Sequence, residues 1–131
     1  IGKAKKIIEG SSLTVVTYGM GVIWMKDFLE NNLEYEGLIE VIDLRSLLPW
    51  DKDMVFDSVK KTNKVIILNE DNITGSISAE ISAVISEFLF EYLDSFFISK
   101  FLVIDFLRLL IILIFIKYNE NVIPISTRKI L

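Results

Sequence analysis

Three acidic side chains, Glu70, Asp71 and Glu80, are the residues of this chain best suited to metal or acid–base chemistry. Carboxylate oxygens are the ligands that Mg²⁺ prefers, and a carboxyl group can act as a general acid or base. Glu70 and Asp71 are neighbours after an apolar stretch, whereas Glu80 lies a helical turn inside the next element. This spacing favours a solvated rim over a metal or acid–base cluster.

Asp43 and Arg45 form a second candidate, because together they could hold a carboxylate or phosphate group of a substrate. Side chains two apart on a strand lie on the same face. The spacing therefore favours a local salt bridge, or a structural clamp on the loop that follows, over a substrate site.

Gly19 and Gly21 form a third candidate, the start of a dinucleotide-binding loop. That fingerprint needs a small residue at position 24, where the helix packs closely against the strand. Position 24 is Trp24, so the pattern indicates a plain turn from a strand into a helix. Such a turn lies at the carboxyl end of its strand, where open α/β sheets place ligands or partners.

The composition excludes several classes of site. The 131 residues include no cysteine and no histidine, which removes thiolate metal sites, disulfides, a cysteine nucleophile and the commonest general base. With 14 basic and 18 acidic residues the net charge is −4, so no nucleic-acid partner is expected. The length fits one domain with a proper core.

The elements that must position these residues alternate between strands and helices. Apolar stretches predict buried strands at 13–18, 39–44 and 64–69, and residues 2–10 predict an edge strand that carries lysines. Asp51 and Ser76 are expected to cap the second and third helices. The alternation predicts an α/β fold with parallel strands and right-handed crossovers. The apolar stripes expected to face the sheet are Val22, Met25, Leu29 and Leu33, then Met54, Val55 and Val59, and finally Ile77, Ile81, Val84, Ile85, Phe88 and Tyr92.

The stretch 96–116 is strongly apolar but carries three charges, Lys100, Asp105 and Arg108. A charge near the centre of a bilayer costs about 2.5–3.5 kcal/mol. The longest uncharged run, 109–116, is also far shorter than the ~20 residues that a spanning helix needs. No membrane partner is therefore predicted, and residues 98–104 are expected to form a last buried strand.

Three stretches carry a resemblance to a known family: GKAKKIIEGSSLTVVTYGMGV, EVIDLRSLLPWD and DSVKKTNKVIILNEDNITGSISAEI. They resemble the C-terminal domain of the beta-type subunit of thiamine-diphosphate-dependent 2-oxo acid dehydrogenases, the decarboxylating first components of the pyruvate and branched-chain complexes. The resemblance runs in unbroken order from residue 2 to about 95. Transketolase and deoxyxylulose-phosphate synthase share this domain, but the stretches 42–45 and 58–62 look more like the 2-oxo acid dehydrogenases.

The resemblance implies a three-layer αβα domain with a five-stranded mixed sheet, transketolase C-terminal-like, covering residues 1–131 as a piece of a longer chain. The edge strand near Ala4–Ile8 would run antiparallel to the other four, and the central strand would lie between those at 39–44 and 64–69. The winding would then switch between Gly19 and Glu70, which predicts a contact crevice. Its expected residues are Tyr18, Gly19, Asn69, Glu70, Thr74 and Gly75.

The resemblance also implies which parts of the enzyme bind the cofactor and which parts hold the subunits together. In such enzymes thiamine diphosphate and magnesium lie between two other domains, so no catalytic, cofactor-binding or metal-ligating residue is expected here. This domain would pack subunits together in the cytoplasm, offer a surface to the acyltransferase core, and be inactive alone. The alternatives left open are the matching domain of transketolase or deoxyxylulose-phosphate synthase and, in another class, a flavodoxin-like binding or regulatory module. The 2-oxo acid stays undetermined, because the substrate pocket would lie in the other domains.

The sequence departs from the family in two respects. Relatives often carry histidine in the segments that match Ile23 and Asn69, so any role of those histidines is not carried over. The pattern also fails over residues 97–117, where the family has a strand and then a proline-containing loop, and it resumes in NENVIPISTRKIL.

Two accounts of residues 97–117 are open: genuine divergence, and a pair of compensating frameshifts in the gene or in its reading. The frameshift hypothesis explains the abrupt start, the abrupt end and the preserved length together. It predicts that resequencing the gene in both directions will show a shifted frame over this stretch. An unbroken frame, confirmed by the mass of a peptide spanning Arg108 to Lys117, would contradict the hypothesis.

Overall fold

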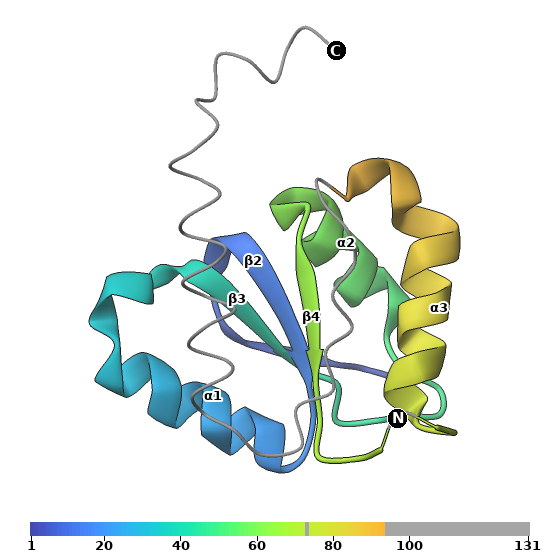
Figure 1. Cartoon of the computed structure of the whole chain (residues 1–131), viewed down its shortest axis with the longest axis horizontal. Helices are drawn as coiled ribbons and strands as arrows, with labels where there is room; N and C mark the ends of the chain where they lie inside the picture. Colours follow the sequence, from blue (N-terminus) through green and yellow to red (C-terminus); the bar gives the residue numbers. More distant parts are fainter. Residues whose placement is uncertain (73, 94–131) are drawn as a thin grey trace, which may run out of the picture.

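The computed structural model describes residues 1–72 and 74–93, which form a mixed sheet with helices on both faces (Figure 1). The elements in chain order are β1 (Lys5–Ile8), β2 (Gly10–Thr17), α1 (Met20–Asn31), the 3₁₀ turn η1 (Leu33–Tyr35), β3 (Gly37–Asp43), α2 (Lys52–Thr62), β4 (Val65–Leu68), α3 (Ile77–Leu89) and the 3₁₀ turn η2 (Phe90–Tyr92). This alternation confirms the predicted α/β fold.

The sheet has the strand order β1-β3-β2-β4. Strand β1 runs antiparallel to β3, while β2 runs parallel to both β3 and β4. The antiparallel edge and the central position of β2 are therefore confirmed. The described sheet has four strands rather than the five expected, and the strand predicted at 98–104 lies outside the described residues, as does the whole stretch 97–117.

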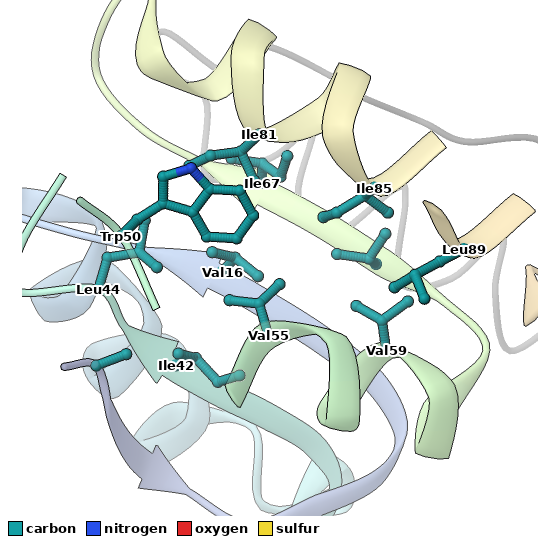
Figure 2. Close-up of a cluster of buried hydrophobic side chains, with 12 residues drawn as sticks. Val16, Ile42, Leu44, Trp50, Val55, Val59, Ile67, Ile81, Ile85 and Leu89 are labelled. Atoms are coloured by element: carbon teal, nitrogen blue, oxygen red, sulfur yellow. The ribbon is translucent and has the colours of Figure 1, made fainter. Parts of the chain in front are cut away.

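Two apolar clusters fill the space between the sheet and its helices. Helix α1 covers one face, where Met25 and Phe28 pack against Leu13, Val15 and Val41. Helices α2 and α3 cover the other face, and Figure 2 shows their inward side chains meeting those of the sheet. This second cluster includes Val16, Ile42, Leu44, Trp50, Val55, Val59, Ile67, Ile81, Ile85 and Leu89. Because consecutive residues of β2 alternate between the two clusters, the strand is apolar on both faces, as its composition predicted.

The predicted helix caps are confirmed. The carboxylate of Asp51 accepts a hydrogen bond from the backbone N–H of Met54, and the hydroxyl of Ser76 accepts one from the N–H of Ala79. Each cap satisfies one of the backbone donors that the first turn of a helix leaves unpaired.

Three members of the predicted apolar stripes do not face the sheet. Leu33 is 70% exposed because α1 ends at Asn31, so this leucine lies in η1 and off the helical repeat; Phe28 is buried instead. Phe88 is also mostly exposed, since the buried stripe of α3 runs through Ile81, Ile85 and Leu89. Tyr92 lies beyond the end of α3, in η2, and is partly exposed.

A buried carboxylate joins the edge strand, the sheet and α2. The side chain of Glu40 in β3 is fully buried, and its Oε1 accepts a hydrogen bond from Ser58 Oγ at 2.5 Å. Its Oε2 pairs with Lys61 Nζ from α2 and lies 3.5 Å from Lys6 Nζ of β1. The backbone N–H of Gly10 donates to the same oxygen at 3.4 Å. One carboxyl group thus connects three strands and a helix.

These contacts shift the pKa values of both kinds of partner. Burial alone would raise the pKa of Glu40, but hydrogen bonds from Lys61, Ser58 and the Gly10 N–H, with the charge of Lys61, hold it below its usual value. Burial alone would lower the pKa of Lys6, but its hydrogen bond to Glu9 and the charge of Glu40 raise it. The ionised forms of Glu40 and Lys6 are therefore both favoured by folding.

We expect Glu40→Gln to lower the free energy of unfolding at pH 7 by about 1–3 kcal/mol, because Lys61, Lys6 and Ser58 lose their contacts with a buried charged group. The folded pKa of Glu40 lies below the ordinary value of 4.5, so its stabilisation is present above that value and is lost as the pH falls through the folded pKa. Urea unfolding of the variant should therefore show a weaker loss of stability on acidification than the parent chain.

Glu9→Gln is the matched control, since Glu9 also pairs with Lys6 and Lys61 but its side chain is 79% exposed. An exposed pair contributes about 0–1 kcal/mol, so this variant should unfold almost like the parent. Equal effects of the two substitutions would show that the buried position of Glu40 does not matter.

Candidate functional site

The carboxyl ends of the three parallel strands lie level with one another. Thr17 in β2 is opposite both Asp43 in β3 and Leu68 in β4. From these ends the chain enters α1 on one face of the sheet after β2, but α3 on the other face after β4 (Figure 1). The winding therefore switches between the ends of β2 and β4, and the residues predicted to line a contact crevice flank this point. The crevice itself stays a prediction.

Hydrogen bonds connect the two sides of this crevice. The Tyr18 hydroxyl, after β2, donates to Asp71 Oδ2 at 2.9 Å and accepts from Asn69 Nδ2 at 3.1 Å. The same Asn69 amide donates to Ser78 Oγ at 2.7 Å, and Ser78 Oγ lies 2.7 Å from Ser76 Oγ at the start of α3. A chain of uncharged polar groups, of which Asn69 and Ser78 are buried, thus joins the two sides and ends at one exposed carboxylate.

The two glycines after β2 have different tasks. Gly19 is the N-cap of α1 with φ +58°, and a side chain there would start 3.7 Å from Glu70 Oε1. Gly21 is buried in the first turn of α1, where a Cβ atom would overlap Thr17 Oγ1 and stand 3.1 Å from Leu68 O. Gly21, rather than position 24, therefore allows the close packing of helix on strand.

The remaining predicted crevice residues, Thr74 and Gly75, lie on the exposed turn that leads into Ser76. Gly75 has φ +77°, and open space surrounds the position of a Cβ atom there. The structure thus brings Tyr18 and Asn69 into direct contact and Gly19 beside Glu70. Ser78 was missed by the sequence analysis, because its only signal is that it follows a cap residue by two positions.

The chemistry of the crevice is that of a hydrogen-bonding surface. Burial raises the pKa of Tyr18. The hydrogen bond that Asn69 donates lowers this pKa, but the hydrogen bond to Asp71 and the charges of Asp71 and Glu70 raise it. The phenol therefore stays a donor at neutral pH. Asn69 is only 1% exposed, and within the described part of the chain its Oδ1 has no hydrogen-bond partner. This acceptor is enclosed by the protein rather than open to solvent.

The three acidic candidates are all exposed at the rim of the crevice or on α3. Among residues 1–72 and 74–93, no group of three or more acidic, histidine or cysteine side chains is arranged to hold a metal ion. Of the three, Asp71 has a defined contact, the hydrogen bond from Tyr18.

Asp43 and Arg45 are joined through the backbone. Asp43 Oδ1 accepts a hydrogen bond from the N–H of Arg45 at 3.1 Å, and Arg45 has φ +58° because the chain turns after β3 ends. No ion pair joins the two side chains in the part of the molecule described above. The role of this pair as a structural clamp stays a prediction.

None of the helices formed by the described residues is long and apolar enough to cross a bilayer.

Comparisons with known proteins give close relatives along part of the chain. It is 46% identical over 85 residues to the pyruvate dehydrogenase E1 component subunit beta of Mycoplasma genitalium, covering 61% of this chain and 24% of that subunit. It is 41% identical over 81 residues to the 2-oxoisovalerate dehydrogenase subunit beta of Bacillus subtilis, with the same coverage of 61% and 24%. The matched part thus spans about a quarter of the length of these curated relatives.

A solved structure shares the fold. The chain described as "Split gene transketolase, inactive beta4 tetramer" superposes with a TM-score of 0.61 at 23% identity, over 67% of this chain and 29% of that one. The family model described as "Transketolase, C-terminal domain" matches residues 2–105, which include every strand and helix given above. The chain therefore belongs to the transketolase C-terminal domain family.

Proposed function

We propose that this chain is the C-terminal domain of the beta subunit in the first component of a 2-oxo acid dehydrogenase complex. The observation that carries the proposal is the 46% identity over 85 residues to a pyruvate dehydrogenase E1 beta subunit. The 41% identity to a 2-oxoisovalerate dehydrogenase beta subunit keeps branched-chain 2-oxo acids beside pyruvate as candidate substrates. The whole enzyme would decarboxylate the 2-oxo acid oxidatively and pass the acyl group to a lipoyl group.

The domain itself would act in assembly, as one part of a longer polypeptide in the cytoplasm. Thiamine diphosphate is expected to bind elsewhere in the enzyme, as the resemblance implies. The cofactor and its magnesium ion would be held by other parts of the enzyme. The surface of this domain would contact those parts, and the acyltransferase core would be a further partner.

The polar surface between the ends of β2 and β4 supports an assembly role. Tyr18 is partly exposed there and joins Asp71 to the buried amide of Asn69, and Ser78 holds that amide in place. The exposed carboxylates of Glu70 and Asp71 would face a neighbouring domain at the rim of the interface.

The assembly role can be tested with a chimera. The matching quarter of the Mycoplasma genitalium beta subunit is replaced by this chain and co-expressed with the other subunits of that component. We expect the chimera to assemble and to oxidise pyruvate, whereas a beta subunit without the quarter and the isolated chain should both be inactive. Size-exclusion chromatography and pyruvate-dependent reduction of an electron acceptor measure the two outcomes. A soluble chimera that fails to assemble would overturn the proposal.

Within the same chimera, Glu70→Arg is expected to weaken subunit association about tenfold, because it reverses a charge at the rim of the crevice. Glu34→Arg is the matched control. Glu34 is also exposed, but it lies in η1, just before the amino end of β3 and not at the carboxyl ends of the strands. Sedimentation at several protein concentrations gives the association constants. Equal constants for the two variants would show that the crevice is not part of the interface.

A further inference from the structure

An aromatic seam runs along the contact between α2 and α3, the two helices that lie side by side on one face of the sheet (Figure 1). Phe56 from α2 and Phe88 from α3 meet with their ring centroids 6.0 Å apart. One turn further along both helices, Lys60 Nζ lies 5.4 Å from the centroid of the Tyr92 ring. In the other direction, the ring of Phe56 packs at 6.2 Å from that of Trp50. Trp50, Phe56, Phe88 and Tyr92 therefore form a continuous aromatic seam.

The outer part of the seam leaves apolar surface open. Phe88 is 60% exposed and Tyr92 is 46% exposed, and Phe90, which lies between them in sequence, is 77% exposed. Because a large aromatic side chain can bury 150–250 Å², these three together expose on the order of 300–400 Å². An exposed apolar patch of that size is often a contact site.

The described part of the chain ends at the same place. Tyr92 is followed by Leu93, the last described residue, which packs against the apolar cluster under α2 and α3. The sequence continues to residue 131, and residues 109–116 read LLIILIFI, a run of large apolar side chains without a charge. The free-energy cost of exposing apolar surface to water grows with its area, so such a run gains strongly from an apolar partner.

We propose that residues 109–116 of the same chain cover the aromatic seam. The run has no charge that would lose its hydration on contact with the seam. Arg108 and Lys117 bound the run in sequence, whereas the charged residues of α3 and η2 are all acidic. These acidic residues are Glu80, Glu87 and Glu91. The basic ends of the run would therefore lie beside carboxylates, and this proposal does not depend on the enzyme to which the domain belongs.

The chain connection favours this occupant over a second copy of the protein. Residues 94–108 link the seam to the run and can span at most about 50 Å. That distance exceeds the length of α3, which is roughly 20 Å for its 13 residues. A tethered segment meets its own chain at effective concentrations that reach the millimolar range. At micromolar protein concentrations, the run of the same chain would therefore occupy the seam before that of another copy.

Tryptic cleavage of the full chain after Arg108 tests the contact, because this bond adjoins the run. We expect Phe88→Ser to speed this cleavage about tenfold, since the run loses one aromatic contact and leaves the seam more often. Leu33→Ser is the matched control, because Leu33 is 70% exposed but lies in η1, after the helix that covers the opposite face of the sheet. Mass spectrometry of the fragment that ends at Arg108 gives the rates. Equal rates for Phe88→Ser and the parent, or protection in the parent that disappears on dilution, would overturn the proposal.

Cross-linking locates the run without changing the seam. The chain has no cysteine, so introduced cysteines are its only thiols. With Ile112→Cys in the run, Glu87→Cys on the exposed side of α3 next to Phe88 should give an intramolecular product with a short bismaleimide. Glu34→Cys, an exposed position in η1, should give none with the same partner. No product from the first pair, equal products from both pairs, or covalent dimers in place of the intramolecular product would each contradict the proposal. Circular dichroism shows that every variant keeps the fold.

Discussion

The buried carboxylate of Glu40 is the contact on which the arrangement of this domain depends. It accepts from the amide of Gly10 at the start of β2, from Ser58 in α2, and from the lysines of α2 and β1. A short outer strand such as β1 has little apolar area of its own with which to hold its place. Its lysine Lys6 pairs with the buried Glu40 and so fixes the strand against the sheet.

The crevice depends on a different constraint, the topology of the sheet. Three parallel strands end at one level, and the helices that follow β2 and β4 leave toward opposite faces. Open α/β sheets place their ligands or partners at such a switch point. In this chain the lining is a chain of neutral hydrogen-bonding groups, which suits contact with another protein surface better than proton transfer.

Periodicity predicted the strands, the order of the elements and two helix caps, because these depend on neighbouring residues. It failed at Leu33 and Phe88, since the end of a helix and the exact angle of its buried stripe are decided by packing. The sequence did not single out Glu40, because one charged residue within an apolar stretch can equally mark the end of a strand. Its partners Ser58 and Lys61 lie 18 and 21 residues away in sequence, and only the path of the chain brings them together. In the crevice, the resemblance supplied the location, but the contact of Asn69 with Ser78 required side-chain geometry.

Gly21 shows how strictly the width of the crevice is fixed. The first turn of α1 lies so close to the ends of β2 and β4 that a single methyl group would overlap the hydroxyl of Thr17 and crowd the carbonyl of Leu68. That hydroxyl in turn donates to the Leu68 carbonyl at 2.8 Å, so the central strand and β4 are joined at the point where the helix packs on them. The absence of a side chain at position 21 therefore sets the distance between α1 and the ends of β2 and β4. A larger residue would push the helix outward and move Tyr18 away from Asn69.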